Sequence, residues 1–268
     1  MGMVFPIRLS ANLGYLWKDL PLLQRIEQAA KAGFGAIELH APTALAKDVA
    51  TLCHDLGLKI ISINTPVGNP DNGDFGLAAQ PDRVQEFQAA FQETLEWACV
   101  TGARYIHVLP GVKPKGDPLL GQICFIDNLR WAADLAQKNN VSLLLEAING
   151  RSKPGYFYHT QEESDAIRRA CARENIKLMF DVFHVGVAQG DVLTRLRTYL
   201  PYIGHIQIAG VPDRKEPDEG EINFREIFRV LAQSGYEGWV GCEYLPRGDI
   251  LEGLKRWTTA CSVSLGQR

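Results

Sequence analysis

Several features that mark other protein classes are missing from this 268-residue sequence. Its apolar runs, such as Ser142–Ala147, are only as long as a strand, whereas a membrane-spanning helix needs about 20 apolar residues. The N-terminus lacks the charged and hydrophobic regions of a signal peptide. Neither sign of charge dominates, because 28 basic residues face 31 acidic ones for a net charge of −3. We therefore expect a cytoplasmic protein that binds neither membrane nor nucleic acid.

Cysteine is sparse and shows no pattern. The six cysteines are widely scattered and form no CxxC motif, so neither a zinc finger nor a disulfide framework is indicated. No linker or low-complexity tract divides the chain. With 46% hydrophobic and 22% charged residues, the sequence predicts one globular domain over residues 1–268.

What the sequence does contain is an alternation of short β-rich runs and longer helical patterns. The expected strands are Arg8–Leu13, Ala36–His40, Lys59–Asn64, Tyr105–Pro110, Ser142–Asn149, Lys177–His184, Ile203–Gly210 and Trp239–Pro246. The expected helices lie near residues 19–32, 43–56, 81–101, 119–139, 161–174, 190–200, 223–234 and 249–262. Eight strand–helix units in a chain of this length predict a single α/β domain, a (β/α)₈ TIM barrel.

Residues that commonly cap helices stand at the expected helix ends, in agreement with this fold. Gly33, Gly57, Gly102 and Gly235 follow helical patterns, where a left-handed residue often ends a helix. Asn223 with Glu226 and Asp249 with Glu252 have the spacing of N-caps. The loops that follow strands are the long, polar ones, and in this barrel those loops form the active face. One of them, residues 65–80, is either a lid or wall of the site or only a surface loop.

Each of the last four expected strands carries one oxygen-bearing polar residue near its C-terminal end: Glu146, Asp181, Gln207 and Glu243. Three carboxylates and an amide oxygen from adjacent strands form a ligand set that suits Mg²⁺ or Mn²⁺. The alternative is a set of buried ion pairs. No Arg or Lys lies mid-strand in these four segments to form them, so the pattern favours a divalent metal.

Four other residues carry weaker signals. His184 follows Asp181 at the expected strand exit, where it can face a metal or a substrate. Arg214 lies in a charged loop on the active face, and such charges are commonly only solvated. His107 and His205 are interpreted as core histidines satisfied by hydrogen bonds.

At these residues the sequence resembles the hydroxypyruvate isomerase family, one of the xylose-isomerase-like barrels. The resemblance is carried mainly by Gly204–Ala209, Val211–Pro217, Gly220–Asn223 and Gly235–Tyr244, and it extends to Ser10–Asn12, Ile63–Pro66 and Leu145–Asn149. It implies that Glu146, Asp181, Gln207 and Glu243 bind the metal. It also implies that Glu146 and Glu243 donate and accept protons, while His184 and Arg214 hold substrate oxygens.

The implied reaction interconverts hydroxypyruvate and tartronate semialdehyde through an enediolate, with a small-molecule substrate and a divalent metal. A 2-oxo-tetronate isomerase or a sugar epimerase remains a near alternative, and a non-catalytic binding barrel a further one. An endonuclease IV-like enzyme is the distant alternative. It needs three zinc ions, whereas Asn64, Leu109 and Gln207 stand where its histidine ligands are expected. The oligomeric state stays open, and a homo-oligomer is compatible with the sequence.

Overall fold

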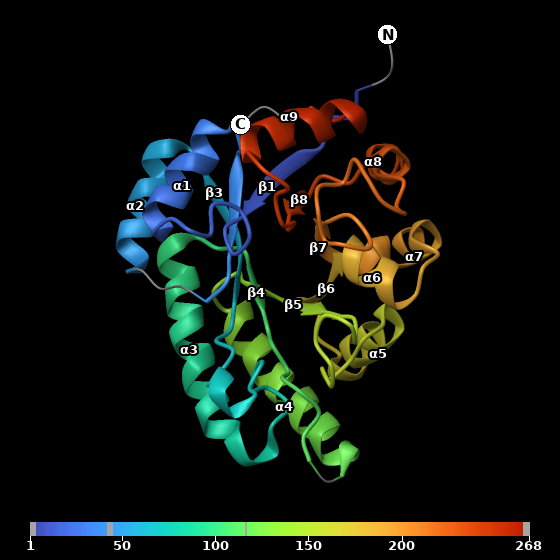
Figure 1. Cartoon of the computed structure of the whole chain (residues 1–268). Helices are drawn as coiled ribbons and strands as arrows, with labels where there is room; N and C mark the ends of the chain where they lie inside the picture. Colours follow the sequence, from blue (N-terminus) through green and yellow to red (C-terminus); the bar gives the residue numbers. More distant parts are fainter. Residues whose placement is uncertain (1–3, 42–44, 116, 265–268) are drawn as a thin grey trace.

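The computed structural model describes residues 4–41, 45–115 and 117–264. Its parallel strands close into a barrel in the order β1 to β8, ringed by helices (Figure 1). The strands are β1 (Arg8–Asn12), β2 (Ala36–Leu39), β3 (Lys59–Asn64), β4 (Tyr105–His107), β5 (Ser142–Glu146), β6 (Ile176–Asp181), β7 (Ile203–Ile208) and β8 (Trp239–Cys242). The closing pair is β1 with β8, where Ser10 lies opposite Gly241. The predicted (β/α)₈ barrel is confirmed.

The helices of the outer ring are α1 (Leu22–Lys31), α2 (Ala46–Leu56), α3 (Val84–Thr101), α4 (Pro118–Gln137), α5 (Gln161–Cys171), α6 (Val182–Ala188), α7 (Val192–Tyr199), α8 (Phe224–Gln233) and α9 (Ile250–Ala260). Short 3₁₀ turns lie in two of the connections: η1 (Pro70–Asn72) and η2 (Pro81–Arg83) between β3 and α3, and η3 (Leu200–Tyr202) between α7 and β7. The start of the second predicted helix, residues 43–44, lies outside the described residues. In the described ranges no helix is long and apolar enough to cross a membrane.

One predicted strand is wrong at its end, because residues 182–184 begin a helix. The run Asp181–His184 resembles β-structure, but the side chain of Asp181 accepts a hydrogen bond from the backbone N–H of Phe183 and caps α6. A capping carboxylate satisfies a helix N–H that would otherwise lack a partner. His184 therefore projects from the first turn of α6, not from a strand.

Several other predicted strands are too long, since their last residues belong to loops at the mouth of the barrel. Strands β4, β5, β7 and β8 end at His107, Glu146, Ile208 and Cys242. Past the end of β7, the backbone bonds within the loop. The N–H of Gly210, for example, donates to the carbonyl of Lys215 rather than to a neighbouring strand.

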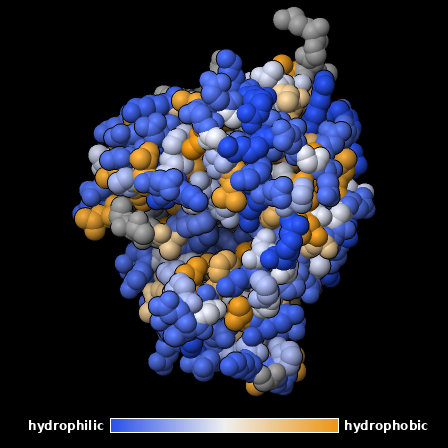
Figure 2. Space-filling model, viewed as in Figure 1, coloured by the Kyte–Doolittle hydropathy of each residue, from blue (hydrophilic) through white to orange (hydrophobic). Residues whose placement is uncertain are grey.

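The helix ends follow the sequence closely. Gly33, Gly57, Gly102 and Gly235 all have φ between 67° and 89°, the left-handed region predicted for them. The side chains of Asn223 and Asp249 accept hydrogen bonds from the backbone N–H groups of Glu226 and Glu252. The core lies between barrel and helices, and α8 buries Phe224, Ile227, Phe228 and Leu231 against it. Figure 2 shows that one face of the molecule is hollowed near its centre.

Candidate active site

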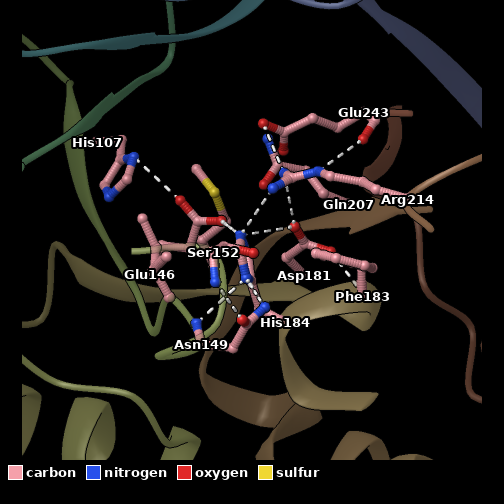
Figure 3. Close-up of polar contacts among 12 residues, drawn as sticks. His107, Glu146, Asn149, Ser152, Asp181, Phe183, His184, Gln207, Arg214 and Glu243 are labelled. Atoms are coloured by element: carbon pink, nitrogen blue, oxygen red, sulfur yellow. Dashed lines mark hydrogen bonds and ion pairs between the residues drawn. The ribbon is translucent and has the colours of Figure 1, made fainter. Parts of the chain in front are cut away.

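A cavity of about 310 Å³ opens at the carboxyl ends of the strands. It is lined by Glu146, Glu243, His107, His184, Arg214 and Lys153. Active sites in this kind of barrel lie at that end. Figure 3 shows Asp181 and Gln207 beside Glu146, Glu243, His184 and Arg214, so the structure brings all six predicted site residues together.

Glu146 ends β5 and is only 6% exposed. Its Oε2 atom lies 3.4 Å from Nδ1 of His107, and its Oε1 atom lies 3.7 Å from Nε2 of His184. Burial, reinforced by the nearby carboxylates of Glu243 and Asp181, raises the pKa of Glu146 well above its usual 4.5. Burial and the neighbouring charges therefore favour the protonated form of this carboxyl group.

Asp181 ends β6 and divides its two oxygens between two tasks. Oδ1 caps α6, whereas Oδ2 faces the site, 3.3 Å from Nη2 of Arg214 and 3.5 Å from Nε2 of His184. Burial raises the pKa of Asp181 to about 7, although Arg214 opposes the shift. Burial thus favours the neutral form of Asp181 more strongly than Arg214 favours its charged form.

The tautomer of His184 follows from its partner Asn149. The backbone N–H of Asn149 can only donate, and it points to Nδ1 of His184 at 3.2 Å. The side-chain amide of Asn149 adds a second donor at 2.7 Å, fixed because its oxygen accepts from the N–H of Ser152. Burial lowers the pKa of His184 well below 6.5, so the ring is neutral. Its proton therefore lies on Nε2, which faces the cavity as a donor.

Arg214 reaches the site from the loop between β7 and α8. Its Nη2 atom lies 3.1 Å from Oε1 of Glu243, and its guanidinium group packs over the rings of Tyr15 and Phe183. The sequence analysis found no Arg or Lys mid-strand in the four segments to pair with the carboxylates, yet Arg214 pairs with Asp181 and Glu243. It considered only the strands, whereas this cation comes from a loop.

Gln207 lies on β7 and is 4% exposed. Its amide nitrogen donates to Oε2 of Glu38 at 2.9 Å, while its Oε1 atom has no hydrogen-bond partner among the described residues. The Oε2 atom of Glu243 is likewise buried without a partner in this part of the chain. Both oxygens are acceptors left unsatisfied beside Arg214.

These observations fit a divalent cation. Ligand atoms of Glu146, Asp181 and His184 lie within 4.8 Å of one another, and the unpartnered oxygens belong to Gln207 and Glu243. Buried acceptors without donors are costly unless a cation satisfies them. Because Nε2 of His184 carries a proton, His184 is not suited to be a ligand. The oxygen set of Glu146, Asp181, Gln207 and Glu243 is the one whose chemistry suits Mg²⁺ or Mn²⁺.

The structure also adds residues that the sequence analysis did not assign to the site. His107, interpreted as a core histidine, contacts Glu146 and lines the cavity. Lys153 lines it too, its Nζ atom 4.6 Å from the centroid of the Phe75 ring. Glu38 is buried beneath the site and bonds to Gln207. Of these, only Glu38 had a usable signal, a carboxylate inside the apolar run Ala36–Leu39.

The loop 65–80 forms part of the cavity wall. Thr65, Val67 and Phe75 line the cavity, and the hydroxyl of Thr65 accepts a hydrogen bond from the N–H of Leu109. A side chain at Gly76, where φ is 120°, would meet the carbonyl oxygen of Leu109 at 2.4 Å. The end of the loop is therefore packed closely against the β4–α4 connection.

Comparisons with known proteins agree with this geometry. The profile of a family described as "xylose isomerase-like TIM barrel" matches residues 26–261. The chain is 38% identical to a putative hydroxypyruvate isomerase of Mus musculus over 258 residues, 93% of each chain. It is also 38% identical to a 2-oxo-tetronate isomerase of Cupriavidus necator over 249 residues, 92% of this chain and 96% of the relative. A solved structure from Brucella melitensis, described as an AP endonuclease of family 2, is 36% identical with a TM-score of 0.91, covering 94% of this chain and 98% of that one.

Proposed function

The chain belongs to the xylose isomerase-like TIM barrel family, as an isomerase of the hydroxypyruvate and 2-oxo-tetronate isomerase group, and we propose that it is a divalent-metal-dependent isomerase of a short hydroxy-keto acid. The reaction moves a carbonyl group between adjacent carbons, and hydroxypyruvate is the first candidate substrate. One observation carries the proposal: two buried carboxylates, Glu146 and Glu243, line one cavity together with donors for substrate oxygens. A 2-oxo-tetronate acid, one carbon longer, is the alternative substrate.

Glu146, Asp181, Gln207 and Glu243 would hold Mg²⁺ or Mn²⁺ through oxygen atoms. When bound, the cation would polarise the carbonyl and hydroxyl oxygens of the substrate and make the carbon-bound hydrogen between them more acidic. The fit rests on the unpartnered oxygens of Gln207 and Glu243 and on the raised pKa of Asp181.

Glu146 and Glu243 would carry the proton. One carboxylate removes a proton from one carbon of the substrate, which gives an enediolate, and a carboxyl group returns a proton to the neighbouring carbon. Figure 3 shows Glu146 and Glu243 on different sides of the His184–Arg214 pair, so a substrate held by that pair would have a carboxyl group on either side. The raised pKa of Glu146 suits such a role, because an acid–base group works best when its pKa is near the operating pH.

His184 and Arg214 would hold a substrate oxygen between them. Nε2 of His184 and Nη1 of Arg214 lie 3.2 Å apart, and both are donors in the tautomer derived above. Two donors this close need a shared acceptor, and a substrate oxygen with partial negative charge provides one. The pair would thus stabilise the charge that develops on that oxygen.

Lys153 would bind the carboxylate end of the acid. Arg214 already faces Asp181 and Glu243, whereas no described carboxylate forms an ion pair with Lys153. Its Nζ atom lies over the Phe75 ring in the cavity wall. An acidic substrate would then lie with its carboxylate toward Lys153 and its reacting carbons toward the two glutamates.

The test is turnover by the Mn²⁺-loaded protein on a panel containing hydroxypyruvate, 2-oxo-tetronate acids and neutral ketoses. We expect the acids to react with kcat/KM at least tenfold above the neutral sugars. If only the neutral sugars reacted, the substrate would be a neutral sugar and not an acid. If no compound of the panel reacted, the proposal would be overturned.

A second function is favoured only by the description of the Brucella melitensis protein. Duplex DNA with an abasic site therefore joins the panel. If the protein cleaved that DNA and the substitution Glu146→Gln abolished the cleavage, the substrate of this site would be DNA and not a hydroxy-keto acid. The net charge of −3 and the single histidine in the ligand cluster weigh against it.

A further inference from the structure

Polar side chains are buried inside the barrel beneath the candidate metal ligands, where apolar residues usually fill the space. Glu38 on β2 is 1% exposed, and Ser10 on β1 and His205 on β7 are fully buried. A buried carboxylate is expensive unless its oxygens are satisfied. The proposed reaction assigns no role to this group.

The contacts of Glu38 are divided between its two oxygens. Oε1 accepts a hydrogen bond from the hydroxyl of Ser10 at 2.5 Å and lies 3.0 Å from Nε2 of His205. Oε2 accepts one from the amide nitrogen of Gln207 at 2.9 Å. A donor therefore faces each oxygen, the hydroxyl of Ser10 at Oε1 and the amide of Gln207 at Oε2, and both oxygens of Glu38 act as acceptors.

This contact decides which way the amide of Gln207 faces. A carboxylate can only accept, so the NH₂ group of Gln207 must point to Glu38 and the oxygen must point away. That oxygen is the buried Oε1 atom without a described partner. A free glutamine amide could turn either its nitrogen or its oxygen toward a cation, and only the oxygen can bind one.

The barrel leaves room for this contact at one position of β8. Gly241 lies opposite Gln207 in the β7–β8 register. A side-chain carbon at Gly241 would lie 2.0 Å from Oε1 of Glu38, well inside contact distance. The absence of a side chain at Gly241 thus allows Glu38 to reach across the barrel from β2 to β7.

We infer that Glu38 is a positioning residue for the metal centre: it holds the amide of Gln207 with its oxygen toward the metal ligands. This inference rests on the proposed function, in which Gln207 is a metal ligand. Partners that orient a ligand commonly change metal affinity by about 10- to 100-fold when they are removed.

The experiment measures Mn²⁺ affinity, by counting the free ion with electron paramagnetic resonance during titration. Glu38→Met removes the acceptor at similar size, and we expect the affinity to fall at least tenfold. Glu38→Gln keeps an oxygen that can accept from Gln207, so this variant should retain most of the wild-type Mn²⁺ affinity. Ser10→Ala is the matched control, because it removes a hydrogen bond from the same carboxylate without touching Gln207. It should change the affinity less than threefold.

A double-mutant cycle separates positioning from general loss of structure. In the Gln207→Ala background, Glu38→Met should cause no further loss of Mn²⁺ affinity. An equal loss in both backgrounds, or none in the wild-type background, would overturn the inference. If Gln207→Ala itself leaves the affinity unchanged, the proposed ligand set is wrong instead.

Gly241→Ala provides a second route if Glu38→Met does not fold. It keeps the carboxylate and pushes it from its place, so we expect a similar loss of Mn²⁺ affinity. An unchanged affinity in the folded Gly241→Ala protein would also count against the inference.

Discussion

The Nη2 atom of Arg214 lies 3.1 Å from Oε1 of Glu243, and the N–H of Leu245 donates to the carbonyl of Arg214 at 2.7 Å. The loop after β7 is therefore bonded to the end of β8 through both side chain and backbone. A group proposed to hold substrate thus lies directly beside a group proposed to carry its proton. Removing either one changes the electrostatic surroundings of the other.

Glu146→Gln and Glu243→Gln should each lower kcat by a factor of about 10² to 10⁴, the usual contribution of general acid–base catalysis. The amide keeps the size of the side chain but cannot carry the proton. Bound Mn²⁺ is measured in parallel, because the same oxygens are proposed ligands. A variant that binds the metal fully and turns over at the wild-type rate would remove that glutamate from the mechanism.

Chelation should abolish activity without unfolding the protein. The barrel buries a continuous core of its own, unlike a zinc finger, whose folding depends on the metal. Circular dichroism should therefore be unchanged after dialysis against EDTA, while Mg²⁺ or Mn²⁺ restores turnover. Full activity in protein shown to be metal-free by elemental analysis would contradict the metal dependence.

Lys153→Met should raise KM for an acidic substrate by about 10- to 100-fold, the equivalent of one charge-assisted hydrogen bond. Any turnover of neutral ketoses should change little, since they present no carboxylate. Lys153→Arg should preserve most of the affinity. Lys138→Met, at the exposed end of α4, removes the same charge far from the cavity lining and serves as the control. Equal effects on acidic and neutral substrates would show that Lys153 does not bind the carboxylate.

Arg247→Ala should reduce the free energy of unfolding by about 2 kcal/mol, because it removes the charged hydrogen bond between the guanidinium group and a buried carboxylate. Glu216 is 1% exposed and lies 2.8 Å from Nε of Arg247. The pair joins the loop that carries Arg214 to the loop after β8. Urea unfolding measures the loss. Arg173→Ala is the control, since its partner Asp134 is half-exposed and the loss of that surface pair should cost about 1 kcal/mol or less.

The same cluster predicts a pH dependence with a defined sign. Burial raises the pKa of Asp218, but Arg256 and Arg247 outweigh it and hold the pKa below 3.8. A lowered pKa in the folded state stabilises the protein above the unfolded value, and this stability is lost as pH falls through the folded value. The difference between wild type and Arg247→Ala should therefore shrink below about pH 4. A difference that stays constant in acid would show that the cost of Arg247→Ala is not electrostatic.

The alternation of strand and helix patterns is enough to predict the barrel. The carboxylates in its strands predict a cation site, because a carboxylate in a strand buried on both faces is costly unless a cation satisfies it. Arg214 was harder to place. Its position depends on a loop whose backbone bonds, such as Leu245 to Arg214, join segments far apart in the chain, and no local pattern predicts them. The orientation of His184 depends in the same way on Asn149, 35 residues earlier.

Glu38 shows a different limit of prediction from the sequence. The rule that singled out Glu146 applies equally to Glu38, an isolated carboxylate in an apolar strand. The sequence does not show that Gly241, near the other end of the chain, leaves the space that the Glu38 side chain fills. Such pairings across a barrel are set by the register of strands that are distant in the chain.

Solvent hydrogen exchange tests how the hydrogen moves between the carbons. A hydride that passes directly from carbon to carbon never meets solvent, whereas a proton held on Glu146 or Glu243 can exchange before it returns. Turnover in heavy water should therefore place deuterium on the product carbon. The buried site can slow exchange, so partial incorporation is the expected result, and it should increase over repeated reversible turnovers. Mass spectrometry and proton NMR measure it, with substrate and metal in heavy water without protein as the control. Product free of deuterium after many turnovers would favour a hydride shift and would remove both glutamates from the proton-carrying role.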